Sequence, residues 1–331
     1  MAQMKYYYEL TVSSSPHAHS PVTTQTIMRD VLIALAPAMV MGVYVFGLRA
    51  LTVTAVSVLA CWFFEKMWNK LMKKHDKTYD LSACVTGVLL AFVCPVTVAY
   101  WQIILGAAFA ILLVKMLFGG LGRNVVNPAL AGRAFMMSWP VAMSTWIQAG
   151  FANSAAIINP VDVVTSPTPL ANMHQGLMPD VSWMDMFIGT IGGCIGETSA
   201  LALLIGLVYL LARKVIKITI PAAYIGTVAV LTVLFPMGNN NLEWMLCQLF
   251  GGGLMLGAIF MATDYVTSPL TTWGQVIYGI GCGVLTVMIR YFGGYNEGVS
   301  YAILIMNSCV VLFDRIGRPT KFGAPKKEAA K

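Results

Sequence analysis

The chain has 331 residues, of which 58% are hydrophobic and only 11% are charged, and its formal net charge is +7. A soluble domain usually carries roughly 25% charged residues and could not bury this much apolar surface, so the composition excludes a soluble fold and indicates a protein embedded in lipid. The positive charges cluster between hydrophobic runs, which is typical of membrane orientation and speaks against nucleic-acid binding.

A polar segment, 1–29, comes first. It lacks the apolar core of a cleavable signal peptide, so we expect it to stay cytoplasmic and the first span to direct insertion. A membrane domain, 30–314, and a basic cytoplasmic tail, 315–331, follow. The pattern predicts an all-α polytopic membrane protein with about ten transmembrane helices. The predicted spans are 30–48, 50–65, 81–95, 98–118, 128–146, 186–212, 218–236, 244–263, 273–291 and 298–314.

Two further patterns occur within the predicted spans. The sixth contains Gly189, Gly192, Gly193 and Gly196 in its first half, which predicts a broken helix followed by a full one. The stretches 94–120 and 268–294 align without a gap, matching Pro95, Thr97 and the Phe-Gly-Gly at 118–120 to Pro269, Thr271 and the Phe-Gly-Gly at 292–294. Two halves with an odd number of spans each would be inverted, so we expect a 5+5 inverted repeat.

The Lys and Arg residues predict the orientation. With the N-terminus inside, every basic residue except Arg49 and Arg290 falls on the cytoplasmic side. The reversed orientation would invert this distribution, and cytoplasmic loops normally carry the basic residues. We therefore expect both termini to be cytoplasmic and the loop 147–183, which has no Lys or Arg, to be extracytoplasmic.

This loop contains the sequence DVVTSPTPL at 162–170. Taken alone, it reads as a polar turn. It also resembles the Asp-x-x-Ser/Thr-x-x-Thr signature of covalent flavinylation, in which a flavin transferase outside the cytoplasm joins FMN to the last Thr by a phosphoester bond. The matching residues are Asp162, Thr165 and Thr168, and the modified one is Thr168; the neighbouring Ser166 is a further candidate for flavin binding. The reaction requires an exposed, flexible hydroxyl, which we expect the loop to provide.

A near-copy of this motif, DYVTSPL at 264–270, has Leu270 where a hydroxyl would be needed, and it falls on the cytoplasmic side. We interpret it as a structural or cofactor-lining turn.

Four other polar residues are candidates for cofactor binding or an ion pathway. Asn127 and Arg133 open the fifth span, where the planar donors of Arg133 could bind a flavin or another anion, or anchor the helix at the interface. Glu197 and Asp264 are candidates for an ion pathway, because an intramembrane carboxylate costs roughly 3 kcal/mol or more, although a structural hydrogen-bond role stays open.

Five stretches carry a resemblance to a known family. They are 118–135 (FGGLGRNVVNPALAGRAF), 162–170, 196–201 (GETSAL), 260–269 (FMATDYVTSP) and 290–305 (RYFGGYNEGVSYAILI). The chain resembles the RnfD family, which are membrane-embedded components of ion-translocating ferredoxin:NAD oxidoreductase (Rnf) complexes. More distantly, it is similar to the B subunit of the sodium-pumping NADH:quinone reductases. Pro167 departs from the pattern, since the family often has a small residue before the Thr.

The resemblance implies an electron-transfer protein in a bacterial or archaeal cytoplasmic membrane, with FMN on Thr168. It implies as partners the iron–sulfur membrane subunits and an extracytoplasmic partner that bears FMN, and it allows a second, non-covalent flavin (riboflavin). Nothing resembles a nucleotide-binding loop, so we expect NAD and ferredoxin to bind other subunits. The coupled ion, Na+ or H+, stays open. Two alternatives remain, namely an ion or small-solute transporter or channel without a redox cofactor, and the B subunit of a sodium-pumping NADH:quinone reductase.

Overall fold

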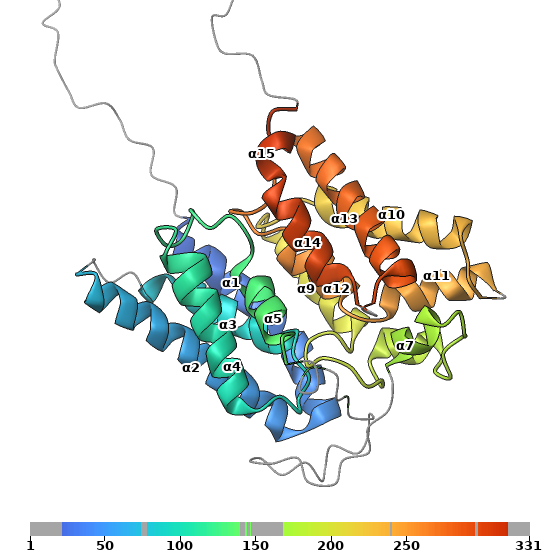
Figure 1. The fold of residues 1–331 in the computed structure, drawn as a ribbon, viewed down its shortest axis with the longest axis horizontal. Helices are drawn as coiled ribbons and strands as arrows, with labels where there is room; N and C mark the ends of the chain where they lie inside the picture. Colours follow the sequence, from blue (N-terminus) through green and yellow to red (C-terminus); the bar gives the residue numbers. More distant parts are fainter. Residues whose placement is uncertain are drawn as a thin grey trace, which may run out of the picture.

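The computed structural model describes residues 22–73, 78–139, 143, 146, 168–238, 240–294 and 297–316. Within these residues every regular element is a helix, which confirms the predicted all-α fold. The helices form two groups (Figure 1). In that view the group from α1 to α5 lies to the left, and the group with α10, α11, α13 and α14 lies to the right.

The first group begins with α1 (Thr24–Phe46) and α2 (Leu48–Leu71), which are joined at Gly47. Gly47 has φ 74°, a conformation that glycine adopts without strain, and this permits the tight reversal. A short 3-10 turn, η1 (Thr78–Asp80), leads into α3 (Ser82–Phe92). After an irregular buried turn come α4 (Tyr100–Ala108), its π-helical continuation η2 (Phe109–Met116), and α5 (Pro128–Met136).

The second group begins with two short helices, α7 (Pro169–His174) and α8 (Trp183–Ile188). The longer helices α9 (Ala200–Ala212), α10 (Thr219–Leu234) and α11 (Asn241–Phe250) follow. The chain continues through α12 (Leu254–Leu256) into a π-helical segment, η4 (Gly257–Met261). It ends in α13 (Thr272–Phe292), α14 (Val299–Ser308) and α15 (Val310–Phe313).

Each predicted span contains helix among its described residues, but not every helix is long enough to cross a membrane. Among the described residues, α1, α2 and α13 have the length and hydropathy of a span, and α11 with α12–η4 makes a fourth that bends by 61°. Five further apolar helices among the described residues have 10–17 residues, and α5 has nine. The sixth predicted span is broken between α8 and α9, as its glycines indicated. The total of ten spans stays a prediction.

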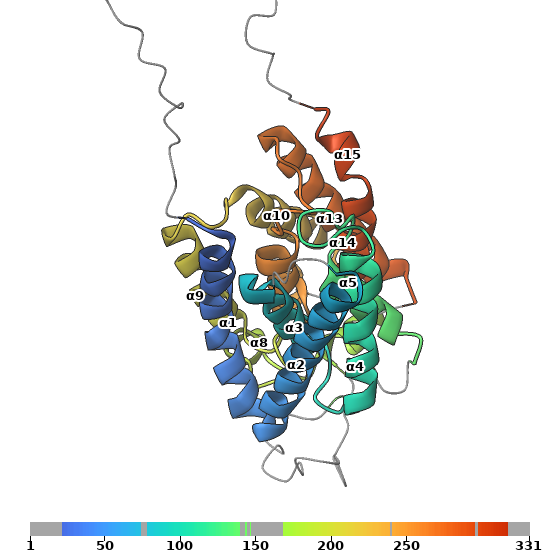
Figure 2. The ribbon, with the colours of Figure 1, turned by 90° about the vertical axis from the view of Figure 1, so that its left-hand side faces the viewer.

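The two turns that open the matched stretches lie at opposite ends of the molecule. The turn after Pro95 contacts the α1–α2 junction, where Arg49 Nε donates to Val96 O at 2.8 Å. The turn after Pro269 contacts the chain beyond α15, where Leu270 N donates to the Asp314 carboxylate at 2.8 Å. Figure 2 places the α1–α2 junction at the bottom and α15 at the top. The matched turns are therefore inverted, which supports the predicted inverted repeat.

The two halves share one apolar core, and α1 packs along α9 at their boundary. At Gly206 a Cβ atom would lie 2.4 Å from Ala34 O, so only glycine permits this backbone approach. Both described ends of the chain, the start of α1 and α15, lie toward the same end of the molecule (Figure 2). This arrangement is consistent with two termini on one side of a membrane.

Candidate cofactor and ion site

Thr168 is the residue that precedes α7, with φ −68° and ψ 152°, and Pro169 opens the helix. Its side chain is only 7% exposed, in contrast to the exposed hydroxyl expected from a long loop. Two residues on, Leu170 packs against the break between α11 and α12, where a Cβ on Gly252 would lie 2.4 Å from Leu170 Cδ1. The other residues of the flavinylation motif, Asp162, Thr165 and Ser166, lie outside the described residues.

A small cavity of about 10 Å³ adjoins Thr168. Two acidic residues line it, Glu197 from the break before α9 and Glu297 from the turn before α14. A cavity of this size is at the lower limit for one water molecule. The remaining lining residues are Pro169, Leu170, Ile191, Gly192, Gly193, Thr198 and Gly252.

Arg133, in the last turn of α5, holds these two carboxylates together. Its Nη1 donates to Glu197 Oε1 at 3.4 Å and to Ser300 Oγ at 2.8 Å. Its Nη2 forms a short charged hydrogen bond to the Glu297 carboxylate. Arg133 is 5% exposed, so it is a buried bridge between α5, the break before α9 and the start of α14 rather than an interface anchor.

The same cluster has the spacing of metal ligands. One ligand atom from each of Cys194, Glu197 and Glu297 lies within 4.8 Å of the other two. However, Arg133 pairs with both carboxylates, and its Nη2 is 4.0 Å from Cys194 Sγ. A guanidinium already supplies a positive charge to these groups, so the cluster is organised around Arg133 and is poorly suited to a multivalent metal ion.

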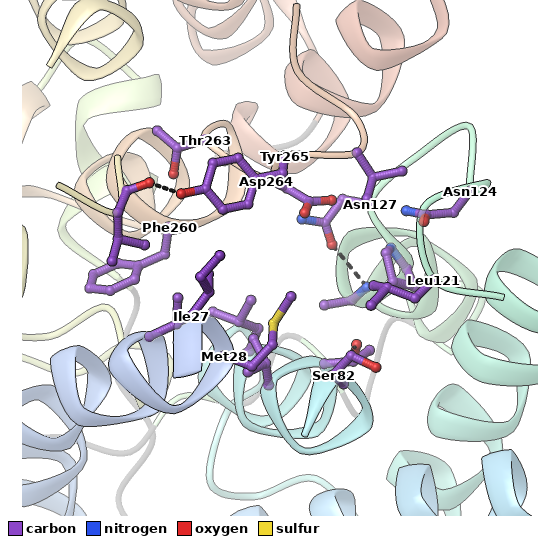
Figure 3. A pocket seen from close by; sticks show the side chains of 18 of the residues that line it. Ile27, Met28, Ser82, Leu121, Asn124, Asn127, Phe260, Thr263, Asp264 and Tyr265 are labelled. Carbon is purple, nitrogen blue, oxygen red and sulfur yellow. Dashed lines mark hydrogen bonds between the residues drawn. The ribbon is translucent and has the colours of Figure 1, made fainter. Parts of the chain in front are cut away.

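A second pocket lies near the opposite end of α5 (Figure 3). Ile27 and Met28 of α1 line one side of it, and Asp264 and Tyr265 of the turn after η4 line the other. Its free volume is about 80 Å³. Desolvation raises the pKa of the Asp264 carboxyl, although hydrogen bonds from the Thr267 hydroxyl and from Val266 N–H lower it. The pocket is mostly apolar, with a few polar groups, as is typical of ligand sites.

Asn127 connects this pocket to the helix that carries Arg133. Its Oδ1 accepts from Ala129 N at 3.0 Å and caps α5, while its Nδ2 donates to Met261 O at 3.3 Å. Asn127 and Arg133 are six residues apart on α5, which corresponds to about 9 Å along the helix axis. One short helix therefore links the two polar regions.

Two features of the site were missed from the sequence. Glu297 is one, although it lies in the stretch 290–305 that carries the family resemblance. The other is a buried ion pair in which Lys115 Nζ is 2.9 Å from Glu65 Oε2 and 2.6 Å from Ser82 Oγ. Lys115 lines the second pocket, whereas Glu65 lines a neighbouring cavity of about 770 Å³. The sequence signal that could have revealed this ion pair is the presence of a lysine, Lys115, within the apolar stretch 98–118.

Comparisons with known proteins agree on one family. A model of the NQR2, RnfD, RnfE family matches residues 11–323. The chain is 47% identical to the D subunit of the Na+-translocating ferredoxin:NAD+ oxidoreductase complex of Acetobacterium woodii, covering 97% of this chain and 98% of that protein. It is 41% identical to the D subunit of the proton-translocating complex of Clostridium ljungdahlii, covering 95% and 96%. It is 32% identical to the D subunit of the ion-translocating oxidoreductase complex of Aeromonas hydrophila, covering 96% and 99%.

Proposed function

Because the chain belongs to the NQR2, RnfD, RnfE family, we propose that it relays electrons through FMN joined to Thr168 in a membrane complex that couples ferredoxin:NAD oxidoreduction to ion translocation. The names of its relatives in A. woodii and C. ljungdahlii support the complex and the reaction. The position of Thr168 beside the buried charged cluster supports a functional role for this hydroxyl. Ferredoxin and NAD bind other subunits.

The surroundings of Thr168 bear on where the flavin would lie. The adjoining cavity holds no more than one water-sized occupant, so the flavin ring has to lie outside it, away from the bundle. Covalent FMN would supply a carrier for the electrons, and residues Thr168 and Pro169 would fix its point of attachment. A ring held on that side could exchange electrons with an FMN-bearing extracytoplasmic partner, while the iron–sulfur membrane subunits pack beside the helices.

The pocket beside Asn127 and Asp264 is the proposed site of a second, non-covalent flavin (riboflavin). Its support is the mixture of apolar walls and polar groups, and its position at the other end of α5 from Arg133. Its free volume of about 80 Å³ is small for a flavin ring, so side chains such as Met28 and Leu121 would have to move. Asp264 faces this pocket and, with Glu197, remains our candidate for an ion pathway.

The relatives do not decide which ion moves. The protein from A. woodii is named for Na+ and the one from C. ljungdahlii for protons, and both match almost the whole chain. A transporter without a redox cofactor would also suit the inverted halves and the buried Glu197. We propose a location in the bacterial cytoplasmic membrane with both termini inside and Thr168 outside, where a flavin transferase could modify it.

One experiment tests both flavins. The complex is purified from cells that contain the transferase, denatured in acid, and separated into pellet and supernatant. We expect in-gel flavin fluorescence from this chain in the wild type and in Thr190→Val, which removes an exposed threonine hydroxyl outside the motif, but not in Thr168→Val. We expect riboflavin in the supernatant, and less of it from Asn127→Leu. A colourless wild-type band would favour the transporter, and a fluorescent Thr168→Val band would refute the attachment site.

A further inference from the structure

We propose that the flavin transferase acts on a form of this chain in which α7 has left its position against α11, and that the docked helix protects Thr168 from modification. The inference rests on the proposed attachment of FMN to Thr168. It adds the order of events, because the flavin has to be attached either before α7 docks or during a transient opening of the folded protein.

The docked helix hides the acceptor hydroxyl. Thr168 is 7% exposed, and the cavity beside it has a volume of about 10 Å³, which is at the lower limit for one water molecule. The main chain is also committed to the helix, because Thr168 O accepts from Ala171 N at 2.8 Å. The transfer requires this hydroxyl about 3–3.5 Å from a phosphorus atom, and a flavin nucleotide does not fit into the space that the docked helix leaves.

The chemistry of the transfer explains why so much room is needed. The donor has to be a flavin nucleotide activated by a pyrophosphate, such as FAD. The Thr168 oxygen forms a bond to the phosphorus of the FMN half, the bond from this phosphorus to the bridging oxygen breaks, AMP leaves, and the hydroxyl proton passes to a base of the transferase. No electrons are transferred. The attacking and leaving oxygens lie in line on opposite sides of the phosphorus, so donor and enzyme have to extend well beyond the hydroxyl.

The contacts of α7 favour local opening. The helix has six residues, and a helix of this length is not stable in isolation. Leu170 and Met173, which are 3% and 1% exposed, pack in a small apolar cluster with Trp244 of α11, separate from the main core. His174 Nδ1 forms a hydrogen bond with Arg290 O of α13 at 2.7 Å. Opening breaks these contacts at the edge of the second group of helices (Figure 1) and leaves the main core intact.

Local opening links the rate of modification to the stability of the docked helix. When opening and closing are fast compared with the transfer, the rate of the transfer follows the population of the open form. Amide hydrogen exchange of residues 169–177 follows the same population. Both rates should therefore rise by the same factor in any variant that weakens the docking of α7.

The test uses the full-length chain, purified in detergent from cells without the transferase. Purified transferase and FAD are then added, and in-gel fluorescence gives the rate of flavin attachment. We expect His174→Ala, which removes one hydrogen bond, to raise this rate about two- to tenfold. Gly252→Ala, whose Cβ would displace Leu170, should also raise it. The matched control is Gly226→Ala in α10, where a Cβ meets nothing within 4 Å, and it should keep the wild-type rate.

Hydrogen exchange of residues 169–177 in the same variants, measured by mass spectrometry, decides whether the effect comes from opening. We expect the logarithms of the two rates to rise together with a slope of about one. Variants that exchange faster but are modified at the wild-type rate would overturn the inference, because the hydroxyl would then be reached in the docked state. A fluorescent band that is missing from the wild type and from every variant would contradict the proposed flavin attachment instead.

Discussion

At the scale of single residues, Arg133 is the side chain on which the candidate site depends. It is buried, and it pairs with Glu197 and Glu297, which lie 64 and 164 positions away in the sequence. Residues so far apart share no local pattern, so the sequence could mark Arg133 and Glu197 as separate candidates but could not pair them. The sequence shows that Arg133 and Glu197 each lie in an apolar segment, whereas their contact with Glu297 exists only in the folded chain.

Replacing Arg133 tests this dependence. Arg133→Gln would leave two buried carboxylates side by side, so we expect a loss of roughly 3–5 kcal/mol in the free energy of unfolding. The double variant Arg133→Gln/Glu297→Gln should recover part of this loss, because one of the two charges is removed. The measurement is denaturant unfolding of the detergent-solubilised protein.

A half-exposed pair provides the comparison. Arg213 Nε is 3.2 Å from Asp30 Oδ2, and the side chains of Arg213 and Asp30 are 52% and 8% exposed. Because solvent reaches Arg213 and the Tyr209 hydroxyl still donates to Asp30, Arg213→Gln should reduce the free energy of unfolding less than Arg133→Gln does. Equal losses for Arg133→Gln and Arg213→Gln would contradict the structural role given to the buried cluster.

At the scale of elements, breaks between short helices position the candidate site. Glu197 lies in the break between α8 and α9, and Gly253 lies in the break between α11 and α12. The glycines of the sixth predicted span revealed the first break in advance. The second was missed because α11 and α12–η4 are both apolar, so a hydropathy window covers them as one span although their axes differ by 61°. The triplet Gly251–Gly253 was the available signal.

Gly252 tests the docking of α7 at the second break. It has φ +66°, and an added Cβ would lie 2.4 Å from Leu170 Cδ1. We expect Gly252→Ala to displace α7 and to speed amide hydrogen exchange at residues 169–177, measured by mass spectrometry. The control is Gly226→Ala in α10, where a Cβ meets nothing within 4 Å. It should be neutral or stabilise by about 0.5–1 kcal/mol, since alanine favours a helix. Unchanged exchange in Gly252→Ala would contradict the docking of α7 through Leu170 at this break.

At the scale of the whole molecule, the two described ends of the chain lie toward one end of the molecule, as the predicted topology requires. Hydropathy and charge predicted the helical membrane fold, and the matched turns predicted the inversion, because both depend on patterns along the chain. The π-helical segments η2 and η4 were not predicted, since a π-helix keeps the apolar composition of the α-helix that it interrupts.

The orientation itself can be measured with a thiol reagent that does not cross membranes. Tyr79 is 66% exposed near η1 and Leu177 is 58% exposed just after α7. We expect Leu177→Cys to react in intact cells and Tyr79→Cys to react only after the cells are permeabilised. The wild type, with its seven cysteines, gives the background. The opposite pattern would reverse the proposed topology and place Thr168 beyond the reach of the transferase.

The inverted repeat has a consequence for vectorial transport. Two halves that are copies in opposite orientation have no preferred direction between them, because whatever one half presents to one side, its partner presents to the other. Direction must come from residues that the repeat does not copy. Here these are Thr168 with α7 at one end, and the Lys115–Glu65 pair at the other. The departures from symmetry, rather than the symmetry, would determine which way charge moves through this molecule.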